Sequence, residues 1–187
     1  KGYGIECDLR PAAGGLPAVF HDETLTRLVD GKDAISALDA RELKRARYKG
    51  SDTHILTFGE LLDLVDGRVP LLVEIKSEWT PPDMVFLGKI ARLALVYKGP
   101  LALMSFDPAV MAVMRDKAPS VPRGIVSGTY AGHGWWNRAL GRNRAHALRD
   151  LLESGAAEPD FYAYQVVALP TPVTRYVREV QGLPLFT

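Results

Sequence analysis

This chain is short of cysteine, of long apolar runs and of excess charge, and each shortage excludes a class of protein. Its 187 residues include one cysteine, Cys7, which excludes an intramolecular disulfide and a cysteine-rich zinc site. Basic and acidic side chains number 23 and 22, so no dominant positive field exists to bind a nucleic acid. No run in the sequence approaches the roughly 20 apolar residues of a membrane span, and we expect no stable membrane insertion. A single cysteine is compatible with the cytoplasm, which is the location we expect.

Short apolar runs alternate with longer helix-like stretches along most of the chain. The runs that predict strands are Gly4 to Leu9, Ala18 to Phe20, Leu71 to Ile75, Leu101 to Ser105, Arg123 to Ser127, Phe161 to Val167 and Leu183 to Phe186. The stretches that predict helices are Ala40 to Ala46, Thr57 to Leu64, Asp83 to Tyr97, Pro108 to Lys117, Arg142 to Glu153 and Pro172 to Gln181. Several strand candidates lack polar alternation, as expected of strands buried on both faces. This order predicts βα units and a mainly parallel sheet.

Polar residues at strand ends favour a closed (β/α)8 barrel over an open doubly wound sheet. They end several different strands, at Asp8, Lys76, Ser105, Ser127 and Gln165. In a barrel such ends surround one mouth, whereas an open sheet concentrates its site at one switch point. We therefore predict an α/β protein with the TIM-barrel fold, as a single catalytic domain over residues 1–187. The fold usually takes about 250 residues, so we expect the barrel to be incomplete.

Four charged residues stand at the ends of two apolar runs: Glu6 and Asp8 in the first, Glu74 and Lys76 in the second. Because side chains alternate along a strand, each pair projects to one face. Three carboxylates brought together would repel one another unless a cation or bound protons held them. Glu74 also follows a core-like run, where an unpaired charge is costly. The set predicts a metal site with a lysine beside it.

The ligand atoms indicate which cation this site would take. Carboxylate oxygens select a hard divalent cation, Mg²⁺ or Ca²⁺, over zinc. Such a cation could polarise a phosphoryl oxygen, and Lys76 would add positive charge for the phosphate. A structural salt bridge between Lys76 and one of the acids is the alternative interpretation of this lysine.

His21 follows the Ala18 to Phe20 run and is the obvious group for proton transfer, because its unperturbed pKa lies near neutrality. A lone histidine is often a structural residue, but Asp22 and the acidic cluster expected nearby favour catalysis. Further along, Trp135 and Trp136 lie in a glycine-rich loop. They could contact an apolar part of a substrate or a membrane interface, although loop tryptophans more often pack onto their own domain.

Four motifs, in this order, resemble the glycerophosphodiester phosphodiesterase family, whose barrels are similar to those of phosphatidylinositol phosphodiesterases. They read Gly4-Ile5-Glu6-Cys7-Asp8-Leu9, Val19-Phe20-His21-Asp22-Glu23-Thr24-Leu25-Thr26-Arg27, Leu72-Val73-Glu74-Ile75-Lys76 and Met104-Ser105-Phe106-Asp107. The resemblance spans nearly the whole chain and implies a (β/α)8 barrel with a small insertion after the second strand, expected at residues 11–50. It also implies metal-dependent hydrolysis of a small-molecule glycerophosphodiester to glycerol 3-phosphate and an alcohol, a reaction of glycerol and lipid metabolism.

The resemblance implies roles for individual residues by motif match. The metal-ligand positions of the family fall on Glu6, Asp8 and Glu74. One of its two catalytic histidines falls on His21, and a phosphate-binding position falls on Lys76. The family mechanism is acid and base catalysis by two histidines, with a neighbouring hydroxyl of the substrate as the internal nucleophile.

Four further residues are expected to line the substrate pocket. Ser105 and Phe106 match a strand-end motif of the family, and we place Gln165 and Trp135 in the same pocket. An apolar groove at the tryptophans would favour an alternative function, that of a lysophospholipase D or sphingomyelinase D-like lipid phosphodiesterase.

Part of the family pattern is not in this sequence. The family begins with a strand ending in His-Arg-Gly, which supplies the other histidine and a phosphate-binding arginine, and it continues beyond the last residues here into a final strand. We therefore expect the chain to correspond to strands 2 to 7 of 8, with further residues in the biological protein. If that histidine is truly lost, the chain would be a non-catalytic phosphodiester-binding module.

Overall fold

The computed structural model describes residues 2–132, 134 and 136–187. The chain divides into two compact units. The first comprises the chain up to Lys76 together with Asp83–Leu103, and the second comprises Ser77–Pro82 together with Met104–Thr187. The prediction of one catalytic domain over residues 1–187 stays a prediction, since two compact units can belong to one domain.

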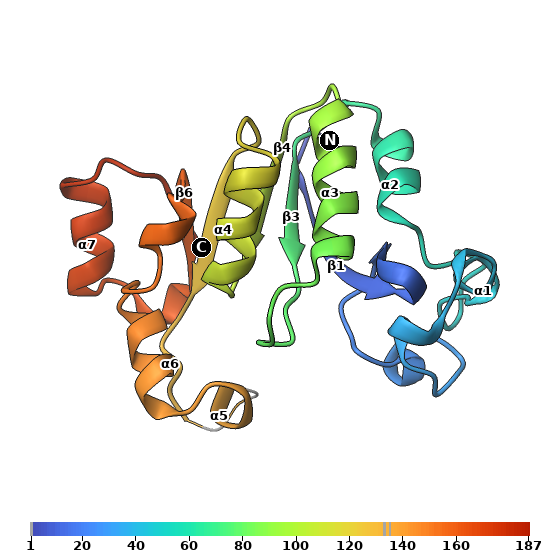
Figure 1. Cartoon of the computed structure of the whole chain (residues 1–187), viewed down its shortest axis with the longest axis horizontal. Coiled ribbons are helices and arrows are strands. Elements are labelled where there is room, and N and C mark those ends of the chain that lie inside the picture. The colour runs from blue at the N-terminus through green and yellow to red at the C-terminus, as the bar shows by residue number, and fades with distance from the viewer. Residues whose placement is uncertain (1, 133, 135) are drawn as a thin grey trace. The chain divides into compact units, whose positions relative to one another are not determined.

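Strands and helices alternate along the chain (Figure 1). Within the described residues the strands are β1 (Ile5–Ala12), β2 (Leu16–Val19), β3 (Leu71–Ile75), β4 (Leu101–Ser105), β5 (Arg123–Ser127), β6 (Phe161–Tyr164) and β7 (Leu185–Phe186). In the same part of the chain the α-helices are α1 (Ala40–Arg45), α2 (Phe58–Val65), α3 (Met84–Val96), α4 (Pro108–Lys117), α5 (Trp136–Ala139), α6 (Arg142–Arg149) and α7 (Pro172–Glu179). Three strands and α4 have the predicted bounds, and α5 is a short helix where a loop was expected.

In the first unit, β1 is the central strand of its group. It pairs in parallel with β3 and antiparallel with β2. Helix α3 packs against β2 and α2. Helix α2 begins at a capping box, in which Thr57 Oγ1 accepts the N–H of Glu60 and the Glu60 carboxylate accepts the N–H of Thr57. Such a box satisfies backbone donors that a helix start leaves open.

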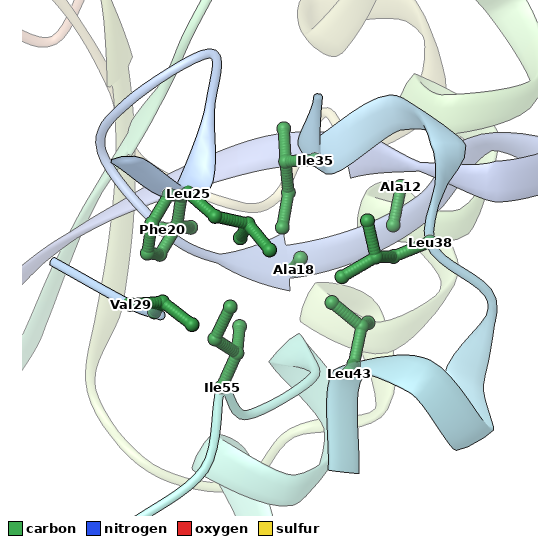
Figure 2. Close-up of a cluster of buried hydrophobic side chains, with 9 residues drawn as sticks. All are labelled: Ala12, Ala18, Phe20, Leu25, Val29, Ile35, Leu38, Leu43 and Ile55. Carbon is green, nitrogen blue, oxygen red and sulfur yellow. The ribbon is translucent and has the colours of Figure 1, made fainter. Parts of the chain in front are cut away.

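The segment expected as an insertion, residues 11–50, contains β2, α1 and short 3₁₀ turns at Leu25–Arg27 and Ile35–Ala37. It has a hydrophobic core of its own. Figure 2 shows the buried side chains of this core pointing toward one another: Ala12, Ala18, Phe20, Leu25, Val29, Ile35, Leu38, Leu43 and Ile55. The segment is therefore an ordered part of the first unit, built largely from irregular backbone. Its identity as a family-type insertion stays a prediction.

In the second unit, β5, β6 and β7 pair in parallel. Gly124 on β5 lies against the ring of Phe161 on β6, so closely that a Cβ at Gly124 would lie 2.1 Å from a ring carbon. Strand β6 ends at Tyr164, three residues before the predicted end, because Val166–Ala168 forms a 3₁₀ turn. The pairing confirms the predicted α/β class with mostly parallel strands, while a closed barrel and its strand number stay predictions.

None of the helices in the described part of the chain combines the length and the apolar composition needed to traverse a bilayer.

Candidate functional site

Strands β1 and β3 carry the candidate site on one face. Asp8 is the register partner of Glu74 in the parallel pairing, and Glu6 lies two residues before Asp8, so it projects from the same face. On the opposite face Leu9 and Ile75 are fully buried. The apolar face holds the two strands in the core, and the carboxylates project from the other.

The three carboxylates meet at this face. Glu6, Asp8 and Glu74 each offer a carboxylate oxygen, and these oxygens all lie within 4.8 Å of one another. Glu74 is buried, Asp8 is half-buried and Glu6 is exposed, so the cluster is accessible at Glu6. The structure thus brings the three predicted ligands together, and their role as ligands stays a prediction.

Lys76 lies within the cluster. Its Nζ is 2.6 Å from Glu74 Oε1 and 2.8 Å from Asp8 Oδ1, and its side chain is 15% exposed. The backbone N–H of Lys76 donates to the carbonyl of Leu9 at 3.0 Å, which extends the β1–β3 pairing one residue beyond β3. The lysine therefore neutralises part of the cluster, and its side chain keeps a small exposure to solvent. This arrangement agrees with both interpretations of Lys76, a phosphate contact and a salt bridge.

Burial and neighbouring charges shift the pKa values of the cluster. Burial, followed by the charges of Asp8 and Glu74, raises the pKa of Glu6. Burial also raises the pKa of Glu74, and the hydrogen bond from Lys76 only partly opposes it. Burial alone would lower the pKa of Lys76, but its hydrogen bonds to Asp8 and Glu74 outweigh that effect and the pKa is raised overall.

The donor set fits a hard divalent cation. Three carboxylates face one ammonium, so negative charge is in excess in the cluster. The pKa values of Glu6 and Glu74 are raised, which means that added positive charge would stabilise their ionised forms. The ligand atoms are oxygens, which suit Mg²⁺ and Ca²⁺. Glu6, Asp8 and Glu74 are the residues that would hold such an ion.

His21 lies in the same unit, directly after β2. The N–H of Phe20 donates to the carbonyl of Asp8 at 3.0 Å, which ties this stretch to the middle of β1. A protonated His21 is close enough to lower the pKa of Glu6 and of Glu74. The structure therefore places the predicted proton-transfer group near the carboxylate cluster.

Cys7 stands between Glu6 and Asp8 but projects to the opposite, apolar face. It is buried, and burial, followed by the charges of Glu6 and Asp8, raises the pKa of its thiol to about 12. A thiol that stays protonated is a poor metal ligand and nucleophile, so Cys7 is a core residue here.

The remaining predicted pocket residues belong to the second unit. Ser105 is buried at the end of β4, and its Oγ accepts the N–H of Asp107 at 3.2 Å. Phe106 is half-buried. Gln165 is exposed after β6, and its Oε1 accepts both the N–H and the hydroxyl of Thr129 at 3.2 Å. Trp135 lies outside the described residues, and the place of all four in a substrate pocket stays a prediction.

Two arginines beside His21 carry contacts that the sequence did not reveal. Arg10 Nε donates to the His21 carbonyl at 2.6 Å, and Arg27 forms two 2.7 Å hydrogen bonds with Asp22. Arg10 could have been found, since it follows Asp8 by two residues on the same strand face. The Arg27 contact spans a 3₁₀ turn, for which no strand or helix periodicity gives a signal.

A sequence model described as the glycerophosphoryl diester phosphodiesterase family matches residues 2–149. A search among curated proteins finds no match.

Solved structures share the fold. A candidate glycerophosphodiester phosphodiesterase from Galdieria sulphuraria matches with a TM-score of 0.73 at 21% identity, over 98% of this chain and 70% of that one. A glycerophosphodiester phosphodiesterase from Agrobacterium tumefaciens matches with a TM-score of 0.69 at 17% identity, over 98% and 72%. An Oleispira antarctica phosphodiesterase, solved with the product sn-glycerol-3-phosphate, matches with a TM-score of 0.70 at 17% identity, over 99% and 72%. At these identities the similarity shows the fold.

Proposed function

The chain belongs to the glycerophosphoryl diester phosphodiesterase family, and we propose that it hydrolyses a glycerophosphodiester to glycerol 3-phosphate and an alcohol with the help of a divalent cation. The observation that carries the proposal is the cluster of Glu6, Asp8 and Glu74, whose oxygens lie within 4.8 Å of one another beside Lys76. The product in the Oleispira structure supports the substrate class.

Each part of the cluster has a chemical task in this proposal. Mg²⁺ or Ca²⁺, when held by the three carboxylates, would supply Lewis-acid polarisation of a phosphoryl oxygen. Lys76 would hold the negatively charged phosphodiester through its ammonium, which Asp8 and Glu74 keep in place.

His21 would move the proton that phosphodiester cleavage requires. The attacking hydroxyl oxygen loses a proton as it bonds to phosphorus, and the leaving alcohol oxygen gains one as its bond to phosphorus breaks. An exposed imidazole near the cluster can serve either transfer. The imidazole is 58% exposed, so a substrate can reach it.

The decisive assay follows release of glycerol 3-phosphate from glycerophosphocholine by the full-length protein, with and without a chelator. Release that stops with chelator and returns with Mg²⁺ or Ca²⁺ supports the proposal. The absence of cation-dependent release with several headgroups would overturn it. His21→Ala should lower kcat by about 10² to 10⁴, while the matched change at the exposed His146 of α6 should leave kcat unchanged.

The two alternative functions predict different results with other substrates. A lipid phosphodiesterase should prefer lysophosphatidylcholine or sphingomyelin, and a binding module should bind glycerophosphodiesters without turnover. Trp136 packs edge-on against Tyr130, with ring centroids 6.0 Å apart, so this tryptophan is engaged within its own unit. We therefore expect glycerophosphodiesters to be the better substrates.

A further inference from the structure

The backbone at His21 is fixed to the strand that carries the carboxylate cluster. The N–H of Phe20 donates to the Asp8 carbonyl at 3.0 Å, and Arg10 Nε donates to the His21 carbonyl at 2.6 Å. The Phe20 side chain is buried in the core of residues 12–55 (Figure 2). These contacts fix where the His21 side chain begins, but they leave its χ rotation and its tautomer free.

Asp22 supplies the missing restraint. Its Oδ1 lies 2.7 Å from Nδ1 of His21. Arg27 donates two hydrogen bonds to the same carboxylate, from Nε to Oδ2 and from Nη2 to Oδ1, each at 2.7 Å. A two-pronged arginine contact of this kind fixes the plane of a carboxylate. Asp22 is therefore held in one orientation, with one oxygen directed at the imidazole.

The turn between Asp22 and Arg27 is held in place by buried side chains. Arg27 ends the 3₁₀ turn Leu25–Arg27, and Leu25 is 4% exposed. Leu25 and Phe20 lie together in the same core (Figure 2). Burial of these two side chains fixes the turn. Asp22 and Arg27 can therefore form their ion pair, although the Arg27 side chain is largely exposed.

The protonation of Asp22 decides which imidazole nitrogen carries the proton. Hydrogen bonds from Arg27, the largest influence, help to hold the pKa of Asp22 at about 2, so the group is a carboxylate at neutral pH. A carboxylate only accepts hydrogen bonds, which means that Nδ1 must donate. In a neutral imidazole with hydrogen on Nδ1, Nε2 carries the lone pair.

We propose that Asp22 is a positioning residue, which holds the imidazole of His21 in its Nδ1–H tautomer and leaves Nε2 to exchange protons with the reacting oxygen. In this arrangement Nε2 takes the proton of the attacking hydroxyl, and the imidazolium that forms is stabilised by the Asp22 carboxylate. Arg27 acts one step further away, by orienting that carboxylate. The inference rests on the proposed role of His21 in phosphodiester hydrolysis, whereas the tautomer can be tested without any activity.

The first test is a nitrogen-15 NMR measurement of the histidine side chains. The chain has 4 histidines, and the His21 signals are assigned as those lost in His21→Gln. Spectra are recorded above about pH 8, where an ordinary imidazole is neutral. The wild-type protein should show Nδ1–H and an unprotonated Nε2, and Asp22→Asn should shift the population toward the other tautomer. An unchanged tautomer in Asp22→Asn overturns the proposal.

The second test is kinetic and has a matched control. Asp22→Asn should lower kcat by about 10- to 100-fold, the usual cost of removing a partner that orients an acting group, with little change in KM. Glu23→Gln makes the same chemical change one residue away, at a side chain that is 70% exposed and 3.9 Å from Arg10, and should leave kcat unchanged. Equal losses in the two variants, or a loss in KM alone, would count against a positioning role.

Stability measurements and an activity-free readout keep the outcomes distinct. If Asp22→Asn lowers kcat only in proportion to a loss of folded protein, the Asp22–Arg27 pair is a structural clamp of the turn and the proposal fails. If the wild-type protein has no phosphodiesterase activity but Asp22→Asn still switches the His21 tautomer, the positioning contact stands and the proposed function is what fails.

Discussion

Asp8 on β1 and Glu74 on β3 are register partners in a parallel pair, so the hydrogen bonds of the sheet hold two carboxylates side by side. Lys76 joins them, with Nζ within 2.8 Å of both side chains. The site is therefore preorganised by main-chain pairing, and its excess negative charge is available to a cation.

Glu74→Gln should weaken cation binding. The substitution keeps the shape of the side chain but removes a charge and one ligand oxygen, and the loss of affinity should be at least about 10- to 100-fold, since changes at groups that only orient ligands already cost that much. Thermal unfolding with increasing Mg²⁺ or Ca²⁺ measures it, because a cation that binds the folded state raises Tm. An equal cation-induced shift in Glu74→Gln and wild type would contradict the site.

Lys76→Met should have the opposite effect on the cation. Without the ammonium, the cluster is more negative and cation affinity should rise. The cation-free protein should lose about 1–3 kcal/mol, because the buried Glu74 is left without its hydrogen-bond partner. Saturating cation should restore much of that stability. Calorimetric titration and urea unfolding provide the two readouts, and a fall in cation affinity would show that the lysine supports the ligands instead of competing with the ion.

Asp22 should make stability depend on pH on the acid side. The pKa of Asp22 is lowered from its ordinary value of 3.8 to about 2 in the folded chain. The stability that ionised Asp22 contributes is therefore present above about pH 4 and is lost as the pH falls toward 2. Asp22→Asn should be less stable than wild type at neutral pH, and the difference should shrink below about pH 4. Urea unfolding at a series of pH values measures this difference, with Glu23→Gln as the control that shows no such trend.

The thiol of Cys7 should be inert in the folded protein. Its pKa of about 12 leaves almost no thiolate at pH 8, and the thiolate is the reactive form. A disulfide reagent should therefore titrate one thiol per chain in urea and almost none under native conditions. Rapid reaction of the native protein would show that β1 opens readily or that the residue is not buried.

The core of residues 12–55 should contribute to stability without contributing to the cation site. Leu43 is fully buried there, and Leu43→Ala should cost about 2–5 kcal/mol. Leu64 on α2 is 59% exposed, and Leu64→Ala should change stability by no more than about 0.5 kcal/mol. Urea unfolding compares the two, and the cation affinity of the folded Leu43→Ala protein should match that of wild type.

Most helices and strands of this chain are predictable because their ends carry strong local signals. Helix α4 begins with Asp107 as its N-cap and Pro108 in its first turn, a combination typical of helix starts. Strand β3 follows Pro70 and consists of apolar residues up to its carboxylate. The period of two along β1 and β3 likewise predicts which side chains share a face, and with it the grouping of Glu6, Asp8 and Glu74.

The pairing of β2 with β1 was not predictable in the same way. Pro11 and Pro17 are register partners in this antiparallel pair, and proline lacks the N–H that a strand ladder uses, so sequence patterns indicate a turn there. The contact between Asp22 and Arg27 is beyond such patterns for a different reason. It depends on a 3₁₀ turn that is held by the burial of Leu25, and that burial is a property of the folded core.

The strict alternation along β1 also determines how the site tolerates errors of folding. If β1 slipped by one residue against β3, Glu6 and Asp8 would turn into the core and Leu9 would turn out to the carboxylate face. The slipped pairing would bury two charges and expose an apolar side chain, so it is penalised twice. The residues that would hold the cation thus also act as a register mark, and any substitution that makes positions 6 and 8 apolar would weaken both the site and the accuracy of strand pairing.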